Sequence, residues 1–107
     1  MAIDNAQLST GSPVEFTVSA SESWAFTTIL VCNKGVASAT FSLYAVKDTE
    51  AVNDNKNKIV NTATVEAGDT FIMDSEKIIL EAGDKLSFQQ NGGTNGDLLV
   101  TVSYIVV

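Results

Sequence analysis

Apolar residues at every second position, in short runs separated by turn residues, most constrain how this chain folds. The clearest runs span residues 37–45 and 98–107, and in each the apolar side chains fall on one face of an extended chain. No segment repeats its apolar residues at the period of an amphipathic helix. The sequence therefore predicts an all-β fold.

The number and spacing of these runs indicate the architecture. We expect about eight strands, roughly eight to twelve residues apart, which is typical of an antiparallel β-sandwich. Jelly-roll or Greek-key connections are expected, and an Ig-like topology stays open because a strand count does not define connectivity. The expected strands cover residues 14–18, 24–33, 37–45, 59–65, 71–73, 77–80, 85–88 and 98–107.

The segment from Trp24 to Asn33 is predicted to be a central strand because aromatic and β-branched residues crowd it. Its near-continuous apolar second half indicates burial on both faces. The lone cysteine, Cys32, lies in this half and is expected to pack as a small hydrophobe. Asn33, Lys34 and Gly35 form an expected tight turn, which predicts a hairpin with the next strand.

A short repeat marks two further turns. Glu66-Ala67-Gly68-Asp69 recurs as Glu81-Ala82-Gly83-Asp84, each time between two apolar runs. Glycine supplies the positive φ that such turns need, and the aspartate can accept a hydrogen bond from a nearby backbone N–H. Both copies are predicted to be connections between strands.

The polar start of the chain suggests a division at Pro13. Residues 1–12 are expected to be an N-terminal polar arm, and residues 13–107 a single sandwich domain. The charged segment 47–58 is expected to be a long exposed loop, and the glycine-rich segment 91–97 a hairpin tip. From the arm, the loop and the tip we take six candidate contact residues: Ile3, Leu8, Val52, Asn53, Asn91 and Asn95.

The charge of the chain limits its partners. Six lysines, no arginine and thirteen acidic residues give a net charge of −7, which opposes binding to nucleic acid or to an anionic membrane surface. No apolar run has the length of a membrane span, and the first residues lack the features of a signal peptide. We expect a protein made in the cytoplasm that binds neither nucleic acid nor membrane.

The chain has no histidine, so the usual general base and imidazole metal ligand are missing. We predict no catalytic residues, no cofactor and no metal. Three hypotheses are favoured less. The first is glycosidase chemistry by paired carboxylates at the solvated turns of Asp69 and Asp84. The others are calcium binding in the loop from Asp48 to Asp54 and a sugar-binding platform of aromatic rings. The rings of the platform would be Trp24, Phe26, Tyr44 and Tyr104.

Three segments carry a resemblance to a known group. Their order is I-x-V-C-N-x-G within residues 29–35, then A-T-F-x-L within 39–43, then A-G-D turns after Val65 and Leu80. In this order the chain resembles small virion proteins of tailed bacteriophages, from about Thr28 to Val107. Relatives of this kind occur as head decoration proteins, tail or neck decorations and fibre domains. The charged insertion 47–58 departs from their pattern.

The resemblance implies a non-enzymatic virion structural protein. We expect a capsid decoration (cement) protein, a homo-oligomer (trimer or dimer), that bridges subunits of the major capsid protein. The alternative is a tail, neck or fibre domain that binds a host-surface glycan or receptor, for which Trp24 and Tyr44 would need to be exposed. A cytoplasmic hydrolase is the remote third hypothesis, because histidine is missing.

The arm hypothesis makes a direct prediction. If residues 1–12 are a free arm, their removal abolishes binding to the particle and leaves the thermal unfolding transition nearly unchanged, because an arm becomes ordered only on its partner. Calorimetry of the shortened chain measures the transition. A collapsed transition would mean that this segment belongs to the core.

Overall fold

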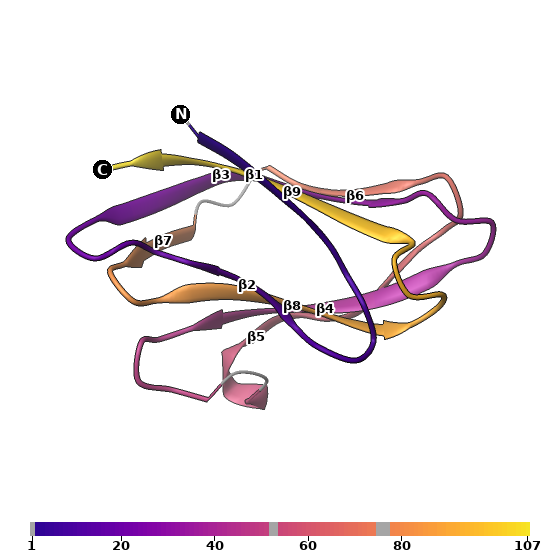
Figure 1. Cartoon of the computed structure of the whole chain (residues 1–107), viewed down its shortest axis with the longest axis horizontal. Coiled ribbons are helices and arrows are strands. Elements are labelled where there is room, and N and C mark those ends of the chain that lie inside the picture. The colour runs from indigo at the N-terminus through magenta and orange to yellow at the C-terminus, as the bar shows by residue number, and fades with distance from the viewer. Residues whose placement is uncertain (1, 52–53, 75–77) are drawn as a thin grey trace.

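The alternating runs form two antiparallel sheets that pack face to face as a sandwich (Figure 1). The structure is a computed structural model, and it describes residues 2–51, 54–74 and 78–107. Within these residues lie a short 3-10 helix, η1 (Asn55–Asn57), and nine strands: β1 (Ala2–Gln7), β2 (Val14–Thr17), β3 (Ser23–Asn33), β4 (Ala39–Val46), β5 (Lys58–Val65), β6 (Thr70–Met73), β7 (Ile78–Glu81), β8 (Lys85–Gly92) and β9 (Leu98–Val106).

The strands pair in a nested order. β4 pairs with β5, β3 with β6 and β7, β2 with β8, and β1 with β9. The resulting sheets have the orders β1-β9-β3-β6, with β7 also on β3, and β2-β8-β4-β5. Because β6 and β7 occupy the same side of β3, they act as two halves of one edge strand. The nested order is that of a jelly roll, so the predicted antiparallel sandwich is confirmed.

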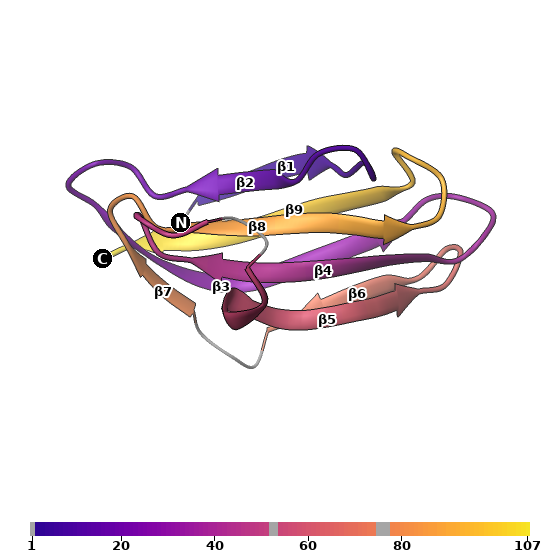
Figure 2. The ribbon, with the colours of Figure 1, turned by 90° about the horizontal axis from the view of Figure 1, so that it is seen from below.

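Figure 1 shows the two sheets as separate layers, and Figure 2 shows them one behind the other. The core residues come from both sheets and pack against each other between the layers. Phe41 on β4 meets Phe71 on β6 edge to face, with ring centroids 5.1 Å apart, and so joins the two sheets directly. At the other end Trp24 stacks on Tyr104 at 4.0 Å. Aromatic pairs of this kind add to the stabilisation that comes from burial itself.

The predicted hairpin between residues 24–33 and 37–45 is wrong. These segments form β3 and β4, which belong to different sheets. The physical reason is the side chain of Asn33, which is fully buried at the end of β3. Its Nδ2 donates to the carbonyls of Ala37 and Val65, at 2.8 and 2.9 Å, and its Oδ1 accepts from the Gly35 amide at 2.9 Å. These bonds hold the chain in the turn that crosses to the facing sheet.

The repeated Glu-Ala-Gly-Asp segments are connections between strands, as predicted. Gly68 and Gly83 have φ values of 81° and 86°, where a residue with a Cβ is strained. Each turn carries the chain from one sheet to the other, from β5 to β6 and from β7 to β8. The Asp84 carboxylate accepts from the amides of Glu81 and Asp48, so the second turn is also tied to the long β4–β5 connection.

The expectation of a free arm at the start of the chain is wrong for residues 2–8. β1 pairs with β9 from Ala2 to Gln7, and the next residue, Leu8, belongs to the buried core. The Leu8 amide donates to the Leu98 carbonyl at 2.9 Å. An edge strand can keep polar side chains in water while its backbone pairs on one side, so the polarity of this segment does not prevent strand formation.

We predict that Leu8→Ala lowers the free energy of unfolding by about 2–5 kcal/mol, because a buried leucine is replaced by a cavity. Urea denaturation followed by circular dichroism measures the change. Ile3→Ala is the matched control, since Ile3 is an exposed apolar residue of the same segment, and it should cost less than about 1 kcal/mol. Equal effects of the two substitutions would contradict the burial of Leu8.

We predict that Asn33→Ala lowers the free energy of unfolding by about 2–4 kcal/mol, because the buried Val65 carbonyl and the partly buried Ala37 carbonyl and Gly35 amide lose their partner. The Gly35 amide should also exchange with deuterium much faster in the variant. Asn61→Ala, at an exposed position on β5, is the control for a general loss of an amide side chain. Unchanged exchange at Gly35 would count against the network.

Candidate interaction surface

The side of the five-stranded sheet that faces away from the core is a single surface, which we call the outer face. Its members follow from the strand registers, because residues paired across a sheet point to the same side. They alternate along each strand with the residues of the core. The described members are Ile3, Asn5, Gln7, Ser23, Ala25, Thr28, Leu30, Cys32, Thr70, Ile72, Ile79, Glu81, Leu99, Thr101, Ser103 and Ile105.

The outer face carries little charge and is rich in apolar side chains. Four of its isoleucines are well exposed: Ile3 by 69%, Ile72 by 59%, Ile79 by 65% and Ile105 by 40%. Among its described members Glu81, the last residue of β7, is the one charged residue. On a chain with a net charge of −7, an apolar face with so little charge is the kind of patch that marks a contact with another protein.

A shallow groove crosses the outer face. Ile3 on β1 lines one side of it, and Leu30 and Thr28 on β3 line the other, with the smaller side chains Thr101 and Ser103 of β9 between them. β9 runs between β1 and β3 in the sheet, so its short residues leave the hollow. The groove can therefore receive one apolar side chain from a facing surface.

The opposite side of the sandwich differs, because part of it is already covered. Tyr44 and Val46 on β4 are buried although they are not members of the core cluster. The 3-10 helix η1 contacts β4, and Figure 1 shows it below the four-stranded sheet, away from the other sheet. The Lys58 ammonium lies 5.6 Å from the centroid of the Tyr44 ring, and Glu15 and Lys85 form an ion pair at 3.5 Å. This side is charged and partly closed by the chain itself.

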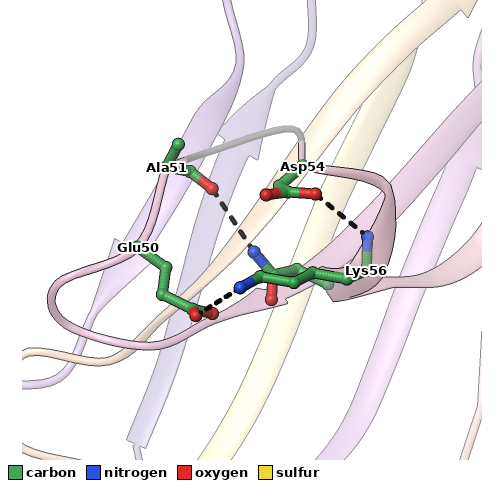
Figure 3. A network of polar contacts seen from close by, with 5 residues as sticks. Glu50, Ala51, Asp54 and Lys56 are labelled. Carbon is green, nitrogen blue, oxygen red and sulfur yellow. Dashed lines mark hydrogen bonds and ion pairs between the residues drawn. The ribbon is translucent and has the colours of Figure 1, made fainter.

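Two acidic side chains of the long loop, Glu50 and Asp54, are engaged within the loop, as Figure 3 shows. Glu50 pairs with the Lys56 ammonium at 2.7 Å, and the Asp54 carboxylate accepts from the Lys56 amide at the start of η1. The hydrogen bond and the negative charge of Glu50 raise the pKa of the Lys56 side chain. Within the described residues no three His, Cys, Asp or Glu side chains come together as metal ligands.

The structure separates the predicted contact residues. Ile3 lies on the outer face, where its exposure makes contact possible. Leu8 lies in the core, so its prediction as a surface contact is wrong: its side chain is enclosed by the sandwich. Val52 and Asn53 lie outside the described residues.

Asn91 and Asn95 are exposed near the end of the sandwich where β8 passes to β9. The side-chain Oδ1 of Asn91 accepts from the Ser42 hydroxyl at 2.8 Å. The side-chain Oδ1 of Asn95 accepts from the backbone amide and the hydroxyl of Thr10, both at 2.7 Å. Both asparagines therefore have structural bonds, and Asn95 holds the segment that follows β1. The β1–β9 register places Ile3 at the other end of β1, far along the strand from this tip.

The rings proposed as a sugar platform do not form an exposed group. Trp24 is 7% exposed and Tyr44 is 5% exposed, and they belong to different sheets. The Trp24 indole N–H donates to the Glu22 carboxylate at 2.8 Å. Neither ring offers the open face on which a sugar stacks.

The sequence-based predictions do not include the outer face, although the sequence contains a signal for it. The runs Phe71-Ile72-Met73 and Ile78-Ile79-Leu80 contain no polar residue, so both faces of each strand are apolar. In the predicted central strand the same signal was interpreted as full burial. The structure corrects this: Leu30 and Cys32 are only partly buried because they point to the outer face, and Cys32 is not a core residue.

The fold and the surface define a jelly-roll sandwich with one open apolar face. Among known proteins, no family model and no curated sequence matches the chain. In the part of the chain that the structure describes, no helix has the length and apolar character to cross a membrane.

We predict that Ile72→Thr changes the free energy of unfolding by no more than about 0.5 kcal/mol, because an exposed side chain contributes little to folding. Phe71→Ala at the neighbouring position should cost more than about 2 kcal/mol, because Phe71 packs against Phe41 and the core. Chemical denaturation of both variants measures the contrast. A large loss for Ile72→Thr would place this residue in the core and remove it from the outer face.

Proposed function

We propose that this chain is a non-enzymatic structural protein of a bacteriophage virion, and specifically a capsid decoration protein that bridges subunits of the major capsid protein. The observation that carries the proposal is the apolar outer face of the five-stranded sheet, with four exposed isoleucines and little charge. A surface of this kind costs little to desolvate and gains from burial, so it suits a protein that works in an assembly.

The fold supports the proposal by analogy. Jelly rolls occur in viral capsid and lectin domains, among others, and a fold alone does not define a function. The resemblance of residues 28–107 to small virion proteins points to the same group. Of the jelly-roll functions, sugar binding is favoured less, because Trp24 and Tyr44 are buried.

Decoration would act by multiplicity. Each copy of the protein would bury neutral and apolar surface across a seam between capsid subunits, and the many weak contacts on one particle would add to resist the pressure of the packaged DNA. The net charge of −7 disfavours contact with the DNA itself. The working form would be a homo-oligomer located in the virion, after synthesis in the host cytoplasm.

The proposal predicts that the purified protein binds emptied phage heads in hundreds of copies per particle. The assay incubates labelled protein with heads, tails and host-cell envelopes, separates each by sedimentation and counts the bound copies. A decoration protein should saturate on heads because its sites repeat over the shell. A control protein of similar size and charge measures nonspecific retention.

The other arms of the assay can overturn the assignment. A few copies on tails, or adhesion to envelopes that soluble sugars compete away, would move the protein to the tail, neck or fibre class. Trp24 is the one tryptophan in the chain, so its fluorescence offers a parallel readout. A spectrum that shifts on addition of the competing sugar would contradict the burial of this ring.

A further inference from the structure

We propose that the outer face binds a second copy of this chain, in a symmetric pair in which Ile72 of each copy enters the groove of the other. The inference names the contact that builds the homo-oligomer of the proposed function, and in that respect it rests on that function. The shape, the charge and the area of the outer face support this contact.

The shape of the outer face is complementary to itself. Ile72 on β6 protrudes, with 59% of its surface exposed, and the groove lies two strands away over β9. Leu30 on β3 is paired with Ile72 on one side and with Thr101 on the other, so the protrusion and the floor of the groove share one cross-strand row. A two-fold axis along β3, within the interface, therefore brings each Ile72 over the Thr101 of the other copy.

This geometry agrees with the way sheets pack. An axis along β3 keeps the strands of the two facing sheets close to parallel, and packed sheets keep their mean strand directions within about 30° of each other. Side chains of the two faces can then interdigitate in a layer about 10 Å thick between the sheets. A symmetric interface of this kind uses the same patch on both copies.

Charge selects the outer face as the contact between copies. Each copy carries a net charge of −7, so two copies that approach through acidic surface repel each other. Glu81, the last residue of β7, is the one charged residue among the described members of the outer face. Asp4 on β1 falls on the other side of its strand, opposite the core residue Val102. An axis along β3 places the Glu81 residues of the two copies on opposite sides of the axis, so two copies can meet here without setting these charges directly against each other.

The area suits a weak pair. An axis along β3 places β6 of one copy over β9 of the other, so three strands of each copy face each other. Strands rise about 3.3 Å per residue and lie about 4.8 Å apart, so three strands over the length of β9 present a flat area on the order of 430 Å². Two such faces bury on the order of 860 Å² in total, which is the size of a weak interface. The relief of the side chains adds to this area.

Strand addition at the edge of the same sheet is favoured less than packing on its face. β1 is one edge of the sheet, and β6 with β7 is the other. At the β1 edge the Asn5 amide is already bonded to the Asp4 carboxylate at 2.9 Å. A charged side chain that caps an edge amide is one of the devices that protect edges from pairing. The face has no comparable protection.

Sedimentation equilibrium of the purified full chain, from about 1 to 200 µM, tests the proposal. We expect a monomer–dimer equilibrium. Ile72→Glu should weaken dimerisation by at least about tenfold, because it sets a carboxylate into an apolar groove. Ile59→Glu is the matched control, since Ile59 is also an exposed isoleucine (46%) but lies on β5 of the other sheet, and it should leave the dimerisation constant nearly unchanged.

A rescue experiment tests the register. If Ile72 meets Thr101 of the other copy, the double variant Ile72→Glu with Thr101→Lys should regain dimers, because each glutamate then faces a lysine across the interface. Thermal unfolding of every variant checks that the fold is retained. A rescue that fails in a folded double variant would overturn the proposed pairing of Ile72 with the groove.

The outcomes separate this inference from the proposed function. A chain that is monomeric throughout the concentration range, or that loses dimers equally in Ile59→Glu and Ile72→Glu, overturns the inference. If such a chain still saturates phage heads, the proposed function remains. A dimer that Ile72→Glu disrupts, combined with no binding to heads, supports the inference and overturns the proposed function.

Discussion

The structure depends on the need of each sheet to bury one apolar face against the other. The nested pairing satisfies this need because every connection, except those from β4 to β5 and from β6 to β7, passes between the sheets. Burial of the core supplies most of the driving force. The crossings themselves are polar, and Asn33 satisfies three backbone groups at one of them. A sandwich of this size therefore combines an apolar interior with hydrogen-bonded ends.

The two sheets bury their inner faces against each other, but their outer faces differ in how far the chain covers them. The four-stranded sheet is partly covered by η1, which contacts β4, and Tyr44 and Val46 on the same strand are buried. The five-stranded sheet has no such cover among the described residues, although its outer face carries four exposed isoleucines. Exposed isoleucines on a rigid sheet are unfavourable in water, and a partner removes this cost. The asymmetry between the faces connects the fold to the proposed assembly role.

Some of the candidate site could be found from the sequence, and some could not. Ile3 is exposed, as a contact residue must be, but it lies on a paired strand and not on a free arm, and its role in a contact stays a prediction. Leu8 was predicted to be a surface contact because its neighbours in sequence are polar. Local polarity does not show that this segment pairs with a distant strand, as β1 does with β9. Ile72 and Ile79 were treated as ordinary strand residues, because alternation does not tell which side of a strand meets the core when both sides are apolar.

The sequence by itself determined the all-β class, the approximate strands and the two glycine turns, because period-two alternation and positive φ are local properties of the chain. Only the tertiary structure decided which strands pair, since the partner of β1 lies at the far end of the sequence. It also decided that β3 and β4 lie in different sheets, through bonds from Asn33 to a residue of β5. The open apolar face is likewise a tertiary property, because it is defined by what fails to cover it.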